Sequence, residues 1–213
     1  GLPMIPVIAE TIAIAKYLIM IEATGVRAHF GLLSSAQSIE LIRAAKAKGL
    51  PVTADVAMHQ LHLTEALIDG FNTLAHVRPP LRSEADKVAL RDAVKSGVID
   101  AICTHHEPLS SSAKMMPFAE TLPGISAFDT YVALGVQLIQ EGLFEPLEWV
   151  EKVTLAPARV ANMQDRWLNE KGWVLVDPAL EWKVDKTSIL SQGKNTPLLN
   201  QNLTGKVVQT FLP

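Results

Sequence analysis

The chain has 213 residues, of which 48% are hydrophobic and 19% charged, and its formal net charge is -3. This length suits one large domain or one domain with an appendage, and the charge gives no reason to expect a nucleic-acid or membrane surface as partner. Cys103 is the single cysteine, so no internal disulfide can form and we expect a cytoplasmic protein. No apolar run reaches the roughly 18 residues that a membrane span needs.

Helical and strand patterns alternate over the first 163 residues. Helical spacing of apolar residues, with Ser35 and Ser83 as caps, predicts helices over 8–24, 36–48, 83–95, 127–140 and 147–153, with a further turn or two at 156–162. Apolar runs that end in polar residues predict strands over 26–33, 51–56, 71–77 and 98–104. This alternation indicates an α/β fold with a parallel sheet, either half of a β/α barrel or a doubly wound sheet. No Gly-x-Gly-x-x-Gly follows a strand, which argues against a dinucleotide site.

The pattern changes after residue 163. Short β-like pieces at 173–178, 182–184 and 206–211 are separated by Gly, Asn and Pro, and they predict a small β appendage. We therefore expect a partial β/α barrel domain at 1–163 and a C-terminal β segment at 164–213. The chain opens at Gly1 without an initiator Met or a targeting signal and goes straight into a helical pattern, so we expect a fragment of a longer protein.

The stretch 99–109 has the form of a buried strand that ends in a loop rich in titratable groups. His29, His59, His105 and His106 all lie in or just after predicted strands. Because strand ends converge on one face of a barrel, these imidazoles could bind a divalent metal. No pair has the spacing of a metal motif, so the alternative is a set of histidines with ordinary hydrogen bonds.

Other polar residues near the predicted strand ends could also contribute chemistry. Asp55 and Asp100 are candidate buried acids, or carboxylates that bond to the backbone or to a basic side chain. Cys103 and His105 could form a thiol–imidazole pair, although no acid that would orient the imidazole is evident. Arg78 precedes a Pro-Pro turn and could clamp a carboxylate, or could be an ordinary surface arginine.

Several segments resemble the dihydroorotase family of the amidohydrolases. Residues 27–35 (Arg-Ala-His-Phe-Gly-Leu-Leu-Ser-Ser) resemble its His-x-x-His-Val-Ser-Thr, 49–61 resemble Gly-x-x-Val-Thr-x-Glu-Val-x-Pro-His-His-Leu, 78–82 resemble Asn-Pro-Pro-Leu-Arg, and 99–109 resemble Ile-Asp-x-Ile-Ala-Thr-Asp-His-Ala-Pro-His. Residues 194–197 and 205–207 resemble the family's C-terminal segment. The resemblance spans almost the whole chain in order. It implies the C-terminal half of a (β/α)8 TIM-type barrel of the amidohydrolase kind, with part of a small β domain.

The resemblance also identifies site positions that are changed. Leu32 and Gln60 stand where the family has metal-binding histidines, and His105 stands where it has the catalytic aspartate. Arg78 replaces a substrate-contacting asparagine, and Leu109 replaces a histidine that helps to hold the substrate carboxylate. Active relatives use zinc, which leucine cannot coordinate, so we expect no cofactor and assign no catalytic residue. If a metal binds, the candidate ligands are His59, His105 and His106.

These departures lead to three hypotheses. The first is a pseudoenzyme, similar to the non-catalytic dihydroorotases of some bacteria, that serves pyrimidine biosynthesis as the structural partner of an aspartate carbamoyltransferase subunit. The second is an active dihydroorotase or related cyclic-amide hydrolase with a rearranged metal site. The third is a small-molecule sensor in which Arg78 grips an anion. Because a half barrel exposes sheet edges and apolar helix faces, we also expect self-association or pairing with the missing N-terminal half.

Overall fold

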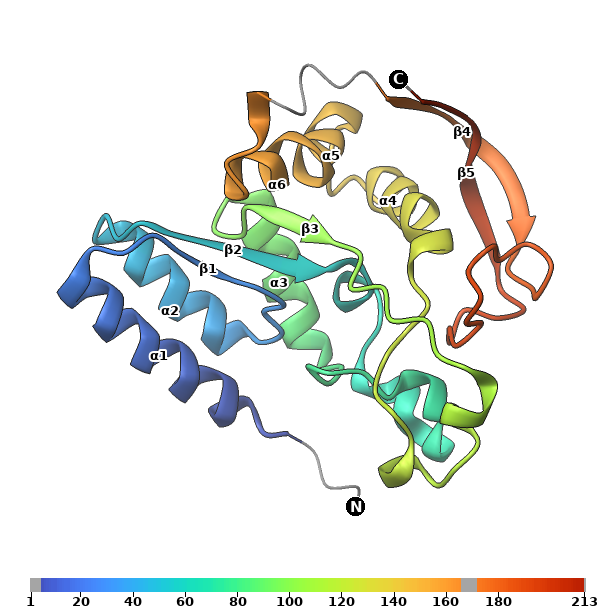
Figure 1. Cartoon of the computed structure of the whole chain (residues 1–213), viewed down its shortest axis with the longest axis horizontal. Helices are drawn as coiled ribbons and strands as arrows, with labels where there is room; N and C mark the ends of the chain where they lie inside the picture. The colour runs from blue at the N-terminus through green and yellow to red at the C-terminus, as the bar shows by residue number, and fades with distance from the viewer. Residues whose placement is uncertain (1–4, 166–171, 213) are drawn as a thin grey trace.

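The computed structural model describes residues 5–165 and 172–212, and Figure 1 shows how its elements are arranged. The helices are α1 (Val7–Thr24), α2 (Ala36–Ala47), α3 (Glu84–Lys95), α4 (Tyr131–Gln140), α5 (Pro146–Val153) and α6 (Leu155–Val160). The strands are β1 (Ala28–Phe30), β2 (Val52–Ala57), β3 (Ala101–Cys103), β4 (Trp173–Lys183) and β5 (Asn202–Phe211). The start of the chain at Gly1, from which we expected a fragment, lies outside the described residues.

The central sheet is parallel, as the alternation of strands and helices predicts. Its strand order is β1-β2-β3, with β2 in the middle. Along β2, the buried Val52, Ala54 and Val56 alternate with the less buried Thr53 and Asp55. One face of the sheet therefore packs on helices, and the other face carries polar side chains.

The first three helices form a layer along the apolar face of the sheet (Figure 1). Ile42 of α2 and Val94 of α3 pack with Val56 in the main core. The predicted helix starts at Ser35 and Ser83 are confirmed, because each serine side chain accepts a hydrogen bond from a backbone amide three residues further on. The local capping signals and the apolar periodicity thus agree on where these helices lie.

The C-terminal β segment is an antiparallel pair that packs on α4. The pieces predicted at 173–178 and 182–184 belong to one strand, β4, and the piece at 206–211 belongs to β5. Gly205 permits close docking, because a Cβ at this position would lie 2.7 Å from Val136 of α4. Val184, Ile189 and Leu198 join the same hydrophobic core as the helices. The domain boundary between residues 163 and 164 stays a prediction.

The predicted strand at 71–77 is wrong. This part of the chain instead forms two 3-10 segments, η2 (Glu65–Phe71) and η3 (Thr73–Ala75). The side chain of Asn72 accepts a hydrogen bond from the Leu74 amide and starts the second segment. Ala75 and Val77 pack in a small separate cluster with Ile125 and neighbouring apolar residues. The apolar run therefore fills a local core beside the sheet.

Helix α1 is apolar on most of its surface. Ile14 and Ile21 are buried, whereas Ile8, Ile12 and Ile19 are 57%, 61% and 69% exposed. The exposed three recur at helical spacing on one side, and we call them the α1 seam. Within 5–165 and 172–212, no helix is both long and apolar enough to cross a bilayer.

Helix α4 packs tightly on α5 at Gly135. A Cβ there would lie 2.2 Å from the ring of Trp149. We expect Gly135→Ala to destabilise the fold by about 1–3 kcal/mol through overpacking, despite the better helix propensity of alanine. Urea unfolding measures the change. Gly31→Ala is a matched control, because its Cβ would meet the Asp55 carboxylate at an ordinary 3.7 Å; a Gly135→Ala protein as stable as this control would contradict the packing.

Candidate functional site

Asp55 on the central strand connects the three parallel strands at their C-terminal ends. Its carboxylate accepts hydrogen bonds from His29 Nε2 at 2.9 Å, from the Leu32 amide at 2.7 Å and from Cys103 Sγ at 3.5 Å. Burial raises the pKa of Asp55, but the bonds from His29 and Leu32 outweigh burial, so the pKa lies below its ordinary value. Asp55 is therefore an ionised acid held in place by its neighbours.

The Cys103 thiol is not a nucleophile in this arrangement. Burial, together with the adjacent Asp55 carboxylate, raises the pKa of Cys103 far above its ordinary value. The thiol donates to Asp55, and no hydrogen bond joins it to the His105 ring in the described part of the chain. Because thiolates carry out cysteine chemistry, the thiol–imidazole alternative finds no support here.

His59 and His105 meet at the ends of β2 and β3. His59 lies in η1 (Met58–Leu61), is 1% exposed, and stacks on His105 with ring centroids 5.6 Å apart. Both ring nitrogens of His59 and Nδ1 of His105 are buried without a hydrogen-bond partner among the described residues. Burial lowers the pKa of His59 to about 3, and the adjacent His105 and His62 add to this effect. His59 is therefore a neutral ring near pH 7.

His106 makes its ring contact with Phe128 and not with this pair among the described residues, and the convergence of three imidazoles stays a prediction. Its Nδ1 accepts hydrogen bonds from the backbone amides of Ala127 and Phe128, at 3.1 and 3.0 Å. The lone pair that would bind a metal at this nitrogen is already used. His106 thus holds the start of the segment that leads into α4.

Gln60 and Leu32, at the two positions where the family has metal-binding histidines, both hold the local backbone in place. The buried Gln60 side chain donates through Nε2 to the carbonyls of Pro79 and Pro80, both at 3.2 Å. Leu32 has a left-handed backbone with φ of 60°, and its amide donates to Asp55. Gln60 therefore fixes the loop that follows Arg78, and Leu32 contributes only its backbone.

The described residues do not by themselves form a zinc site. A zinc site needs about four nitrogen, sulfur or oxygen ligands at short range. Leu32 offers none, Gln60 offers only a neutral amide oxygen because its nitrogen holds the loop carbonyls, and Nδ1 of His106 already accepts from two backbone amides. Among residues 5–165 and 172–212, no group of three or more His, Cys, Asp and Glu side chains is arranged to hold a metal ion.

Arg78 and Leu109 line different cavities. Arg78 is exposed and borders a pocket of about 470 Å³ together with His76 and Phe118. Leu109 borders a second pocket of about 410 Å³, and its amide donates to Asn195 Oδ1 at 2.7 Å. The two positions that the resemblance links to substrate binding thus border separate pockets, and their joint role stays a prediction.

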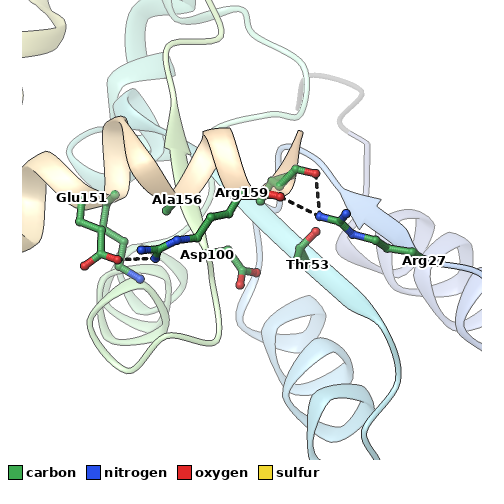
Figure 2. Close-up of a pocket in the computed structure, with 8 residues that line it drawn as sticks. Arg27, Thr53, Asp100, Glu151, Ala156 and Arg159 are labelled. Atoms are coloured by element: carbon green, nitrogen blue, oxygen red, sulfur yellow. Dashed lines mark hydrogen bonds and ion pairs between the residues drawn. The ribbon is translucent and has the colours of Figure 1, made fainter. Parts of the chain in front are cut away.

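A polar pocket of about 260 Å³ lies at the opposite, N-terminal ends of the strands (Figure 2). Arg27 donates to the carbonyls of Arg159 and Val160 at the end of α6, at 2.8 and 2.9 Å. Arg159 pairs with Glu151 at 2.6 Å, and Asp100 pairs with Lys46 outside the pocket at 2.7 Å. Lys152 also lines the pocket and donates to the Ile99 carbonyl. The bonds of Arg27 join the segment before β1 to the end of α6. Asp100 is accordingly a structural carboxylate.

Asn195 is an anchor that the sequence analysis did not single out. It is 3% exposed, and its amide nitrogen donates to the carbonyls of Glu107 and Gly124 at 3.0 and 3.1 Å. With the bond from Leu109, it fixes the loop after β3 against the C-terminal segment. The signal was present, because Asn195 lies within the segment 194–197 that resembles the family.

Comparisons with known proteins show which proteins this chain is similar to. No family model matches the chain. It is 43% identical over 215 residues to a dihydroorotase-like protein of Pseudomonas aeruginosa, a match that covers 100% of this chain and 51% of that protein. It is 37% identical to a dihydroorotase of Syntrophus aciditrophicus, with 100% of this chain and 50% of that protein covered.

The chain is a dihydroorotase homologue. It spans about half the length of the curated relatives that it matches. The recognition made from the sequence motifs is thereby confirmed at the level of the family.

Solved structures show the fold of this dihydroorotase homologue. L-hydantoinase (dihydropyrimidinase) from Arthrobacter aurescens matches with a TM-score of 0.87 at 22% identity, over 97% of this chain and 48% of that one. The inactive dihydroorotase-like domain of the Chaetomium thermophilum CAD-like multifunctional protein matches with a TM-score of 0.69 at 19% identity, over 92% of this chain and 52% of that one. The predicted part of an amidohydrolase-type barrel is confirmed.

The buried histidine predicts a specific dependence of stability on pH. In the unfolded chain His59 has its ordinary pKa of 6.5 and takes up a proton as the pH falls below that value. In the folded protein its pKa is about 3, so the ring stays neutral until the pH is near 3. We therefore expect the free energy of unfolding to fall by about 1.4 kcal/mol per pH unit across this window for this group. Urea unfolding at a series of pH values measures the slope.

His59→Phe tests the origin of that slope. The variant keeps an aromatic ring against His105 and removes the titrating group, so the slope should flatten. At pH 7 it should cost no more than about 1 kcal/mol, because no hydrogen bond of the ring is lost within the described structure. His62→Phe is the comparator. Burial lowers the pKa of His62 to about 4, so the contribution of this group to the slope ends near pH 4. Equal slopes in the wild type and the His59 variant would refute the assignment.

Proposed function

We propose that this dihydroorotase homologue of pyrimidine metabolism has lost the hydrolysis of dihydroorotate and acts as a structural partner of aspartate carbamoyltransferase in the cytoplasm. The observation that carries the first part is the structural use of the former ligand positions. Gln60 bonds to the Pro79 and Pro80 carbonyls, and Leu32 contributes only its amide. Leucine has no side-chain atom that binds a metal, and the Gln60 side chain is held at the loop by its amide nitrogen.

The backbone conformation at two of these positions supports the proposal that the fold was kept while the chemistry was lost. Leu32 and His105 have φ values of 60° and 47°, in the left-handed region that few non-glycine residues adopt. Such conformations are costly and usually belong to functional sites. Here they carry one side chain that cannot bind metal and one ring packed against His59.

The names of the relatives support the same proposal. Proteins of Pseudomonas aeruginosa and Pseudomonas putida that match over the whole chain are called dihydroorotase-like. One structural neighbour is described as an inactive dihydroorotase-like domain of a multifunctional protein. Inactive members of this fold therefore exist, and a scaffolding role within pyrimidine synthesis explains why an inactive one is retained.

The small-molecule sensor is a second candidate because of one observation. Arg78 makes no hydrogen bond or ion pair with the described residues, and it borders the pocket of about 470 Å³. An unpaired guanidinium beside a partly apolar cavity suits an organic anion. The enzyme with a rearranged site has less support, because Nδ1 of His106 already accepts from two backbone amides.

A metal and activity assay tests the loss of hydrolysis. The protein, in the longest form in which its source makes it, is expected to contain no stoichiometric zinc and to show no turnover of dihydroorotate, with or without aspartate carbamoyltransferase. Each missing catalytic group costs about 3 kcal/mol of barrier, or about a hundredfold in rate. An active dihydroorotase assayed in parallel is the positive control. Stoichiometric zinc with turnover that His105→Ala abolishes would establish the rearranged enzyme instead.

The same preparation tests the partnership. Mixed with aspartate carbamoyltransferase from the same source, it is expected to co-elute with that enzyme in size-exclusion chromatography. Separate elution of the two proteins at all concentrations tried would refute the structural role while leaving the loss of hydrolysis standing.

The α1 seam and the neighbouring edge of β1 support a further expectation about association. β1 is the outer strand of its sheet, and the seam lies on the helix that precedes it. A further strand and helix would continue both layers, and the relatives are about twice as long as this chain. We therefore propose that the other half of a barrel covers this surface.

Without that half, the chain is expected to self-associate through the α1 seam. Ile12→Lys with Ile19→Lys should reduce self-association in sedimentation velocity, because charges prevent burial of this surface. Ala13→Lys is the matched control, since Ala13 is exposed on α1 but outside the seam. A wild-type chain that sediments as a monomer at all concentrations would contradict the expectation.

A further inference from the structure

A pocket between the loop after β3 and the C-terminal segment has an unusual charge balance. Its volume is about 410 Å³, and three lysines line it, Lys114, Lys186 and Lys194. Among the described residues no acidic side chain lines it, while the polar side chains of Thr73, Ser111, Gln192 and Asn195 do. Leucines and a methionine form the rest of its wall. The pocket is thus cationic with an apolar side.

Lys114 is the most informative of these lysines. It is 6% exposed, and its Nζ donates to the His76 carbonyl at 2.9 Å. No carboxylate lies within 4 Å of this ammonium in the described residues. Glu107 acts on it from further away and raises its pKa, but burial dominates and lowers the pKa to about 8. Buried charges in proteins are almost always paired, so this ammonium lacks a counterion.

Lys194 reinforces the point from the C-terminal segment. It is half-buried, its Nζ donates to the Ile189 carbonyl, and it too forms no ion pair with the described residues. Lys186 is exposed at the mouth of the same pocket. Each ammonium has three donors, so the carbonyl bonds leave donors free for a ligand.

We propose that this pocket binds a small organic molecule with a compact dianionic group of the phosphate class. Lysines act as point charges toward phosphate, and three cations suit a dianion better than a single carboxylate. The volume falls in the lower part of the usual range for small-molecule sites, roughly 300–1,000 Å³, and leaves room for a body beside the leucines. The ligand would bridge the loop held by Asn195 and the C-terminal segment.

This site is distinct from the strand-end centre. His59, His105 and Asp55 do not line it, and Leu109 is the one position shared with those that the family resemblance links to substrate. The inference does not depend on whether dihydroorotate hydrolysis is lost, because none of the lysines belongs to the former metal site.

The experiment is a thermal-shift titration of the whole protein with inorganic phosphate and with phenyl phosphate, at ionic strength held constant with sodium chloride. A ligand that binds the folded state raises Tm in a saturable way. We expect saturation with both probes and tighter binding of phenyl phosphate, which also contacts the apolar wall. A stronger response to inorganic phosphate would assign the site to the free ion and overturn the organic ligand.

Three variants locate the binding. Lys114→Met and Lys194→Gln should each weaken phenyl phosphate binding about tenfold or more, since each removes a charged hydrogen-bond donor. Lys194→Gln keeps the test valid if the buried Lys114→Met variant does not fold. Lys16→Gln, on the exposed side of α1, is the matched control and should leave binding unchanged.

Two further outcomes would overturn the proposal. One is the absence of any saturable shift with either probe. The other is loss of binding in Arg78→Gln with full binding in Lys194→Gln, which would move the anion to the pocket beside Arg78. Amine labelling followed by mass spectrometry gives a second readout, because phenyl phosphate should protect Lys114 and leave Lys16 reactive.

Discussion

The carboxylate of Asp55 is the interaction on which the strand-end region depends. It sits on the central strand, and it satisfies a ring nitrogen from β1, an amide from the following loop and a thiol from β3. A buried donor left without a partner costs about 1–3 kcal/mol, and less where water can reach it. His29 is exposed and Leu32 and Cys103 are half-buried, so removing this acid would leave the amide and the thiol as the two donors without ready access to water. The paths of the loops that carry Leu32 and His105 are therefore constrained by a group that takes no part in metal binding.

Local signals in the sequence predicted the helices well and part of the site. Ser35 and Ser83 mark helix starts because a side chain and an amide only three residues apart decide a cap. The position of His59 at a strand end also followed from pattern. The run at 71–77 was misread because its apolar side chains pack against residues near Ile125, far along the chain.

The fate of individual site residues could not be read from the sequence, because it depends on distant backbone groups. Nδ1 of His106 accepts hydrogen bonds from the amides of Ala127 and Phe128. The Gln60 side chain donates to the carbonyls of Pro79 and Pro80. Gly193 illustrates the same dependence, since a Cβ there would come within 2.4 Å of the Leu109 amide. The C-terminal segment is thus part of the framework around the strand ends. A division into domains by the change in sequence pattern after residue 163 does not reveal this contact.

The bonds of Gln60 have a consequence for the history of this protein. A histidine at this position would lack the amide group that donates to the two loop carbonyls, so Gln60→His would loosen the loop. On the proposed loss of hydrolysis, this substitution would bring a cost in stability and no gain in activity while Leu32 and His105 stay unchanged. Selection on stability alone would then keep Gln60 in place.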